Sequence, residues 1–384
     1  MNTEYKKKII AISPAYPYRG GQALVEAYLY KTLSESGYDF QTVSYKLLYP
    51  SVFFPGTTQF DTSKTVPFEH SEKIFRILNS INPFTWWRAY RHIKKQKPSA
   101  VIIVWWMPFF GPCLGFLARK IKKSLKDTKV IFLVENYVSH ENRPFDRFFT
   151  RHTLKRADVL ICESSFIKEQ IVTDFPEKQI FQTTLSVYSC YNSNRYTKAS
   201  AREKLNITDK NVVLFFGLIR PYKGLDKLIE TFPEILKTQP DTTLLIVGEC
   251  YEDIDKYHKL IEQYDLKKNT LLIDKFIPNE EVELFFKASD LIVMPYYSGT
   301  QSGILMVAYA FGIPVVVTNV GGIAELVNEK TGTVVKDNSV SNLAPAILNV
   351  MQNPSQIPYE ENIRNITQSL GYANMNEIMT RIID

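Results

Sequence analysis

Short apolar runs alternate with longer amphipathic segments along most of this chain. The runs are rich in Val, Ile, Leu and Phe, as in strands covered on both faces, while the longer segments repeat apolar residues with the helical period. The strands predicted in the first half cover residues 8–13, 40–45, 101–106, 130–134 and 159–162. The predicted helices cover residues 23–35, 71–97 with a break at Pro83, a segment from about 112, 143–156 and 164–173.

The same alternation resumes near residue 211 and continues through the second half. Predicted strands cover residues 212–216, 243–247, 270–273, 291–294 and 315–318, and predicted helices cover 224–237, 251–264, 279–288 and 304–311. Strands that alternate with helices indicate a parallel sheet with helices on both faces. The pattern therefore predicts an α/β protein with two Rossmann-like domains that face a cleft.

The boundary between these domains is expected in residues 183–201, which are rich in Ser, Thr, Asn and Tyr and lack periodicity. We place the first domain at residues 1–195 and the second from residue 196. At 384 residues the chain is long enough for two separate cores.

Residues 100–118 contain no charge and could be mistaken for a membrane span. Pro and Gly residues interrupt this stretch, so a buried strand, a loop and a helix start explain it better. Four scattered cysteines without a C-x-x-C spacing indicate free thiols in a reducing compartment and offer no zinc site. The polar start, residues 1–8, lacks an apolar signal core, so we expect a cytoplasmic protein.

The charge is unevenly distributed. Residues 1–195 hold 28 Lys and Arg against 16 Asp and Glu, whereas the remainder holds 18 against 24. A basic first half favours an anionic partner such as a membrane surface, with a solvated basic face as the alternative. Residues 85–97, TWWRAYRHIKKQK, add aromatics to a basic helix, which suits either the inner face of a membrane or a packed helix with a wet basic face.

The loop after the first strand of the second half, within residues 215–224, carries Arg220 and Lys223 beside Gly217. Two cations on a strand-to-helix loop are suited to hold a diphosphate, Arg as a fork and Lys as a point charge. The alternative is a loop with exposed cations.

Three further loops follow strands of the same predicted sheet. Gly248 and Glu249 follow the second strand, while the segment after the third offers backbone groups and an apolar surface for a nucleobase through Phe276, Ile277 and Pro278. After the fourth strand, the polar loop 298–303 leads into a helix whose free N–H groups would bind an anion, with Thr300, Gln301, Ser302, Gly303 and Ile304 at its start. All four loops are expected at one edge of the sheet.

Two glycines, Gly20 and Gly21, follow the first strand of the first half and allow a ligand to approach the backbone; a flexible connection is the alternative. His140 and Glu141 lie beyond the strand 130–134, where open α/β sheets place ligands.

With these motifs, the chain resembles the group-1 (family 4) retaining glycosyltransferases of GT-B fold. The second half is similar through GLIRPYKGLDKLIE, LLIVGE, FIPNEEVELFFKASD and AYAFGIPVVVTNVGGIAELV, and the first half through ISPAYPYRGG, INPFTWW, WWMPFFGP and SHENRPFDRFFTRHTLKRAD. The resemblance implies a nucleoside diphosphate sugar donor on residues 196–367 and an acceptor on the first domain, near Gly20, Gly21 and Glu141. It also implies that a last helix, at about 368–384, crosses back to the first domain.

The family usually carries two glutamates eight residues apart, and the corresponding positions here are Gly299 and Val307. Thr300, Gln301 and Ser302 would supply neutral hydrogen bonds instead, and Glu325 is the nearest acid. A histidine is frequent at the position of Glu135, and Leu218 replaces a common arginine, leaving Arg220 as its substitute.

These features predict sugar transfer from a nucleoside diphosphate sugar to an acceptor hydroxyl with retention, in polysaccharide or glycolipid synthesis. Arg220, Lys223 and His140 are the expected catalytic residues, with no metal and no other cofactor. The main alternative is a GT-B protein that binds a nucleotide sugar but has impaired catalysis. An epimerase, a phosphorylase or a nucleic-acid-binding protein is less well supported, because no matching signature occurs.

Overall fold

The computed structural model describes residues 7–50, 58–137, 145–352 and 356–383. The chain forms two compact units. The first comprises Met1–Thr62, Val66–Ser186 and Leu370–Asp384, and the second comprises Ser63–Thr65 and Val187–Ser369. The main break thus lies at residue 186, whereas the boundary predicted from the sequence lies at residue 195.

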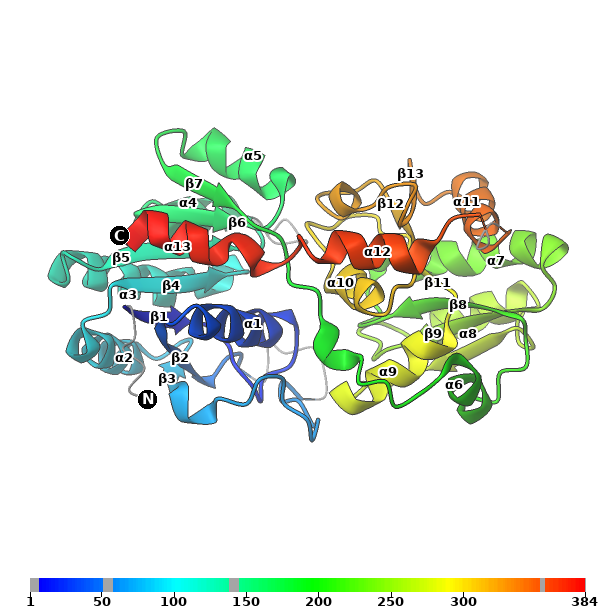
Figure 1. Cartoon of the computed structure of the whole chain (residues 1–384), viewed down its shortest axis with the longest axis horizontal. Helices are drawn as coiled ribbons and strands as arrows, with labels where there is room; N and C mark the ends of the chain where they lie inside the picture. Colours follow the sequence, from blue (N-terminus) through cyan, green and yellow to red (C-terminus); the bar gives the residue numbers. More distant parts are fainter. Residues whose placement is uncertain (1–6, 51–57, 138–144, 353–355, 384) are drawn as a thin grey trace. The chain divides into compact units, whose positions relative to one another are not determined.

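The first unit is built on a parallel seven-stranded sheet with the order β3-β2-β1-β4-β5-β6-β7 (Figure 1). Its strands are β1 (Lys8–Ile12), β2 (Asp39–Leu47), β3 (Ile74–Asn79), β4 (Ala100–Trp105), β5 (Lys129–Val134), β6 (Val159–Cys162) and β7 (Gln179–Gln182). Its helices are α1 (Gly21–Glu35), α2 (Pro83–Gln96), α3 (Gly111–Ser124), α4 (Asp146–Leu154), α5 (Ser165–Asp174) and α13 (Met375–Ile383). All residues of β4 are buried, as expected for a central strand covered on both faces.

Helices cover both faces of this sheet. The chain moves one way across the sheet from β1 to β2, and the opposite way from β3 through β4 and β5 to β6. Because parallel crossovers are right-handed, α1 lies on one face, while α2, α3 and α4 lie on the other. Helix α3 contacts both α2 and α4, and α13 contacts α1. In Figure 1, α1 and α13 lie in front of the strands.

One predicted element is wrong. Residues 71–82 are expected to be helical, but β3 occupies Ile74–Asn79 and pairs with β2 in parallel. Ile74 and Leu78 are four residues apart and imitate a helical stripe, yet β3 lies at the edge of the sheet and most of it is only half-buried. The helix predicted after Pro83 is confirmed as α2.

The second unit contains a parallel six-stranded sheet with the order β10-β9-β8-β11-β12-β13. Its strands are β8 (Asn211–Phe216), β9 (Thr242–Val247), β10 (Thr270–Ile273), β11 (Leu291–Met294), β12 (Val315–Thr318) and β13 (Gly332–Val335). Its helices are α6 (Lys198–Lys204), α7 (Leu225–Thr238), α8 (Asp255–Gln263), α9 (Asn279–Ala288), α10 (Gly303–Ala310), α11 (Val340–Gln352) and α12 (Tyr359–Thr367). The strand order reverses between β8 and β11, and open α/β sheets bind ligands beyond the carboxyl ends of strands at such a reversal.

The end of the chain forms two helices rather than one. α12 belongs to the second unit, whereas α13 belongs to the first. Between them, the hydroxyl of Tyr372 donates to Glu163 Oε1 over 2.7 Å, and Thr183 Oγ1 donates to Asn374 Oδ1 over 2.8 Å. The expected return of the chain end to the first unit is therefore confirmed, through α13.

The stretch 100–118 forms β4, a 3-10 turn (Pro108–Phe110) and the start of α3, as predicted. Across the described ranges, no helix combines the length and the apolar character needed to cross a membrane.

Candidate active site

The four predicted loops of the second unit lie at one edge of its sheet. They follow β8, β9, β10 and β11, which are parallel neighbours, so their carboxyl ends meet at the same edge. This arrangement confirms the expectation drawn from the sequence.

Gly217, Lys223 and Ile304 come together at the centre of this edge. Gly217 follows β8 with φ of 102°, a backbone conformation that favours glycine. A Cβ atom placed on Gly217 would lie 3.1 Å from Lys223 Nζ and 3.2 Å from Ile304 Cδ1. The loop after β8 and the start of α10, which are separated by more than eighty residues, therefore form one surface.

Lys223 is a buried cation. Lys223 is the last residue of a 3-10 turn, Pro221–Lys223, and only 7% of it is exposed. Burial and, secondarily, the charge of Arg220 lower the pKa of Lys223 to about 7. None of the ion pairs recorded among the described residues includes Lys223. A desolvated ammonium beside a second cation is stabilised by an anionic ligand, so this position is a candidate anion site.

Two aromatic rings accompany these cations. Lys223 Nζ lies 5.7 Å from the centre of the Tyr296 ring, and the Arg220 guanidinium lies 5.0 Å from the centre of the Tyr251 ring. Arg220 is half-buried and precedes the 3-10 turn in an extended conformation. The rings attract the cations and fix their approach to the edge of the sheet.

Gly248 lets the ends of β8 and β9 approach closely. A Cβ atom on Gly248 would lie 2.1 Å from the Gly217 carbonyl oxygen, so only glycine fits without a backbone shift. The next residue, Glu249, is half-buried, and its carbonyl accepts a hydrogen bond from Ile219 N over 3.0 Å.

The loop after β10 begins α9. Phe276 and Pro278 are half-buried, whereas Ile277 is buried. The backbone N–H of Asn279 donates to Ser63 Oγ over 2.8 Å, and its side-chain amide donates to the Thr65 carbonyl over 3.0 Å. The start of α9 is thus capped by a distant part of the chain, while Phe276 and Pro278 remain at the edge of the sheet.

The side chains in the loop before α10 differ in how deeply they are buried. Thr300 and Ser302 are buried, whereas Gln301 is half-buried. Ser302 Oγ lies 3.5 Å from both Tyr296 Oη and Met294 Sδ, so this hydroxyl faces the interior. Of these three, Gln301 is the best placed to reach a ligand by its side chain.

Helix α10 starts at Gly303 with Ser302 as its N-cap, and the Ser302 side chain makes no capping hydrogen bond. Free N–H groups at a helix start bind anions. A Cβ atom on Gly303 would lie 3.1 Å from Tyr188 Cε2, which explains why a residue without a side chain begins this helix.

The two positions where the family carries glutamates are packed with apolar groups. Val307 is buried within α10, and a Cβ atom on Gly299 would lie 2.8 Å from Ile323 Cδ1. Glu325 lies in a 3-10 turn, Ala324–Leu326, and is exposed.

In the first unit, Gly20 and Gly21 follow β1 and start α1 at the carboxyl edge of its sheet. Both are exposed. The adjoining Gln22 donates from Nε2 to Glu135 Oε2 over 3.2 Å, which links this loop to the end of β5. His140 and Glu141 lie outside the described residues.

Two buried acids at this edge were not among the site residues predicted from the sequence. Glu135 follows β5 and Glu163 follows β6, in register with each other, and both are buried. Burial, and then the charge of Glu163, raise the pKa of Glu135 well above its ordinary value. A polar residue directly after a buried strand was the available signal. Tyr296 was also missed; it lies two residues after the end of β11.

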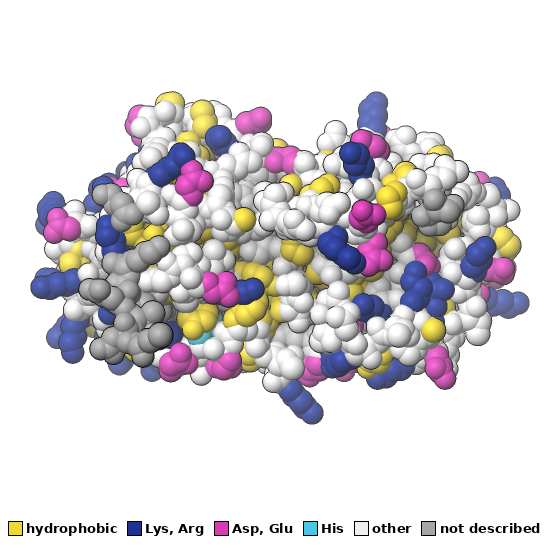
Figure 2. Space-filling view, in the orientation of Figure 1, with side chains coloured by type: hydrophobic (Ala, Val, Ile, Leu, Met, Phe, Trp, Pro, Cys, Tyr) yellow, Lys and Arg dark blue, Asp and Glu magenta, His cyan; other side chains and the backbone are white. Residues whose placement is uncertain are grey.

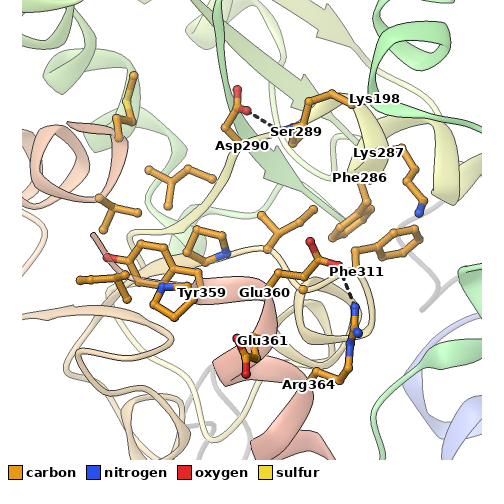
Figure 3. Close-up of a pocket in the computed structure, with 18 of the residues that line it drawn as sticks. Lys198, Phe286, Lys287, Ser289, Asp290, Phe311, Tyr359, Glu360, Glu361 and Arg364 are labelled. Carbon is orange, nitrogen blue, oxygen red and sulfur yellow. Dashed lines mark hydrogen bonds and ion pairs between the residues drawn. The ribbon is translucent and has the colours of Figure 1, made fainter. Parts of the chain in front are cut away.

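A separate hollow of about 1020 Å³ lies at the opposite edge of the second sheet (Figure 3). Its lining includes Asn211, Leu291 and Pro314, at the amino ends of β8, β11 and β12. Two ion pairs, Lys198–Asp290 and Arg364–Glu360, neutralise much of its charge. Because it lies at the opposite edge of the sheet, this hollow is distinct from the candidate site.

In the described parts of the chain, no group of three or more His, Cys, Asp or Glu side chains is arranged to hold a metal ion.

Comparison with known proteins connects this site to a family. Residues 197–369 match the model of "Glycosyl transferases group 1". The chain is 29% identical over 244 residues to a putative glycosyltransferase, YtcC, of Bacillus subtilis, covering 59% of each chain. It is 28% identical over 168 residues to D-inositol 3-phosphate glycosyltransferase of Rhodococcus jostii, covering 42% of this chain and 37% of that protein. The matches therefore span less than two thirds of these relatives.

Solved structures extend the likeness to the whole chain. Sucrose-phosphate synthase from Thermosynechococcus elongatus superposes with a TM-score of 0.74 at 18% identity, covering 98% of both chains. Anabaena HepE in complex with UDP gives a TM-score of 0.73 at 15% identity, covering 98% of this chain and 99% of that one. Residues 197–369 thus resemble the group-1 glycosyltransferases, and the chain as a whole has the GT-B fold.

Proposed function

We propose that this protein transfers a sugar, of the hexosyl type, from a nucleoside diphosphate sugar to an acceptor hydroxyl with retention of configuration. The observation that carries the proposal is the buried Lys223, brought together with Gly217 and the start of α10 at the strand-order reversal. A buried cation without a recorded ion-pair partner in the described residues suits a diphosphate. HepE, which shares the fold, has been crystallised with UDP-glucose, and this supports a nucleotide-sugar donor.

In this reaction the bond between the anomeric carbon and the phosphate oxygen breaks, and the acceptor oxygen bonds to the same carbon. The acceptor proton leaves with the diphosphate, where negative charge develops. Lys223, Arg220 and the N-terminus of α10 stabilise this charge electrostatically, without a metal ion. His140 is assigned from the sequence alone to orient the donor sugar or the reacting hydroxyl.

The donor is assigned to the second unit and the acceptor to the first. Gly248, Glu249, Phe276, Pro278 and Gln301 lie along the donor edge, where a nucleoside and a sugar would be held. Gly20 and Gly21 are assigned to a glycan or lipid-linked acceptor. The basic first half favours a protein that works at the inner face of a membrane in polysaccharide or glycolipid synthesis.

The second candidate is a protein that binds a nucleotide sugar with little or no transfer. The apolar packing around Gly299 and Val307 favours it, because neither position offers a carboxylate to the donor. Both candidates share the diphosphate site and differ only in turnover.

A panel of nucleoside diphosphate sugars distinguishes them. The cognate donor at about a hundred times its Kd should raise the free energy of unfolding by about 2.7 kcal/mol, which a thermal-shift assay detects. Sugar transfer or slow donor hydrolysis, followed by release of the nucleoside diphosphate, then supports the first candidate. A shift without turnover supports the second, and no shift with any donor contradicts both.

Donor binding should take up a proton at alkaline pH. The pKa of Lys223 is about 7 in the free protein, so above this pH the amine is mostly neutral and must be protonated to face the diphosphate. Affinity should then fall up to roughly tenfold per pH unit above about pH 7.

Calorimetric titration of the cognate donor in buffers of different ionisation enthalpy measures this uptake. About one proton should be taken up near pH 8.5 and almost none near pH 6. The diphosphate of a nucleotide sugar does not titrate in this range, so uptake reports on the protein. The Lys223→Met variant is the control and should show none; equal uptake by both proteins would contradict the assignment.

A further inference from the structure

The residues that open the second unit pack against the helix that begins at the candidate diphosphate site. The long stretch of the first unit ends at Ser186, and the second unit continues from Val187. We call residues 187–195 the connecting segment. It contains a 3-10 turn, Ser189–Tyr191, which contacts both α9 and α10.

Tyr188 of the connecting segment covers the first residue of α10. Tyr188 is buried, and the three atoms nearest to a Cβ atom built on Gly303 all belong to it: Cε2 at 3.1 Å, Oη at 3.8 Å and Cζ at 3.9 Å. The backbone N–H of Tyr188 also donates to the Met306 carbonyl over 3.4 Å. The absent side chain of Gly303 therefore makes room for the Tyr188 ring.

The connecting segment also holds the far end of α10. Asn192 Nδ2 donates to the carbonyl of Ala310, the last residue of the helix, over 2.9 Å. α10 has only eight residues, and a helix of this length is not stable by itself in water. Its direction is therefore set by its packing contacts, of which these two lie at its ends. Free N–H groups at a helix start attract an anion only within the first turn, so this direction matters for binding.

The later part of the connecting segment is fixed on α9. The buried carboxylate of Glu283 accepts hydrogen bonds from Ser193 Oγ over 2.6 Å and from Arg195 N over 2.8 Å, and it also pairs with Arg195 Nε over 3.3 Å. Hydrogen bonds to a charged group are among the stronger ones. α9 begins directly after Pro278, in the loop assigned to the nucleoside. One short segment thus holds two helices that begin at the donor edge.

We propose that the connecting segment couples the diphosphate site to the chain connection between the two units, with Tyr188 as the positioning residue that directs the N-terminus of α10. This inference rests on the proposed function, because it requires a nucleoside diphosphate at that helix start. Tyr188 acts through Gly303. Since coupling is reciprocal, a bound diphosphate should in turn stabilise the connecting segment.

Calorimetric titration of the full chain with UDP, GDP, ADP and TDP, each compared with its monophosphate, tests the positioning role. Tyr188→Ala should raise the Kd of the tightest-binding diphosphate about five- to thirtyfold, the range over which a helix terminus contributes to anion binding. It should change the Kd of the monophosphate less, so the difference between the two ligands narrows. Tyr188→Phe keeps the ring and should bind both ligands like the natural protein.

A double-mutant cycle tests the contact itself. Gly303→Ala should raise the Kd of the same diphosphate about threefold or more, because its Cβ displaces either the Tyr188 ring or the helix start. In the Tyr188→Ala background the ring is absent, and Gly303→Ala should have little effect. Equal effects in the two backgrounds would overturn the proposal. If Tyr188→Ala does not fold, Gly303→Ala alone decides, and an unchanged Kd would overturn it.

Hydrogen exchange tests the reciprocal effect. The backbone N–H groups of residues 188–192 should exchange more slowly when the diphosphate is bound to the natural protein, and this protection should be weaker in Gly303→Ala. Exchange that the ligand leaves unchanged in this segment would overturn the coupling.

Tyr359→Ala is the matched control. Tyr359 is a buried tyrosine of the same unit, and it lines the hollow at the opposite edge of the sheet (Figure 3). Acidic and basic side chains lie next to one another over α12, which Tyr359 starts, so this region offers a nucleotide little net attraction (Figure 2). The control should lower the free energy of unfolding and leave the Kd of the diphosphate unchanged.

The outcomes separate this inference from the proposed function. A natural protein that binds none of the four diphosphates would contradict both. Binding by the natural protein that Tyr188→Ala leaves unchanged, or that Tyr188→Ala and Tyr359→Ala weaken equally, would overturn only the role given to the connecting segment.

Discussion

Replacing Lys223 by Met should lower turnover about 10²–10³-fold while the protein remains folded. Lys223 is the buried cation of the candidate site, and its ammonium would face the charge that develops on the leaving diphosphate. Met has a similar length and lacks the charge, so it removes the electrostatic contribution without opening a large cavity. Steady-state kinetics with the cognate donor measures the loss, which should appear as a lower kcat and, because the charge of Lys223 also binds the donor before reaction, as a higher KM.

The pH dependence of stability provides an internal check. The pKa of Lys223 is lowered from 10.5 to about 7 in the folded protein, so between these values the unfolded chain holds a proton that the folded one has released. The free energy of unfolding therefore rises with pH across this window, and the unfavourable contribution is fully present below it. Lys223→Met should lack this rise and be at least as stable as the natural protein at neutral pH.

The matched control is Lys227→Met, four residues further along in α7. Lys227 is partly exposed and pairs with Glu230 over 2.7 Å, so its replacement should change turnover by no more than about twofold. Full activity of Lys223→Met, or an equal loss in both variants, would contradict the role given to Lys223.

Replacing Gly321 by Val should destabilise the second unit by about 3 kcal/mol and disrupt donor binding. Gly321 has φ of 52°, and a Cβ atom there would lie 1.6 Å from the Gly299 carbonyl oxygen. The next residue donates from Gly322 N to the Thr300 carbonyl over 2.9 Å. Relief of the clash must therefore displace the loop that leads into α10. Urea unfolding and donor titration measure the two effects.

Gly21→Ala is the control for stability. Gly21 starts α1 in the first unit, and a Cβ atom there would meet no atom within 4 Å. Ala favours a helix over Gly, so this variant should be as stable as the natural protein or up to about 1 kcal/mol more stable. A Gly321→Val protein with unchanged stability and donor affinity would show that this loop does not depend on the turn at Gly321.

Most of the fold was predictable because central strands of a parallel sheet are apolar throughout. β11, β12 and α9 have the residue ranges predicted from the sequence, and all are strongly apolar or strongly periodic. β3 was missed because an edge strand is only partly buried, and its spacing imitates a helix. β13, Gly332–Val335, was also missed; it is short, and its central residues are partly exposed.

The sequence predicted which loops form the candidate site, but it did not predict which of their residues contact one another. Strand order and chain direction placed the four loops at one edge. Lys223 Nζ lies 5.7 Å from the centre of the Tyr296 ring and shares the space beside Gly217 with Ile304. Tyr296 and Ile304 come from other parts of the chain, so no local pattern around residue 223 reveals these neighbours. For the same reason the inward direction of the Ser302 hydroxyl, set by Tyr296 and Met294, could not be read from the sequence.

The return of the chain end to the first unit also affects synthesis on the ribosome. α13 and Tyr372, which donates a hydrogen bond to Glu163, are made after the whole of the second unit. The second unit can therefore complete its sheet during translation before the first unit receives the segment from residue 370 onwards. A nascent chain stalled before residue 370 would leave the part of α1 that α13 covers exposed, and such apolar surface is where chaperones bind.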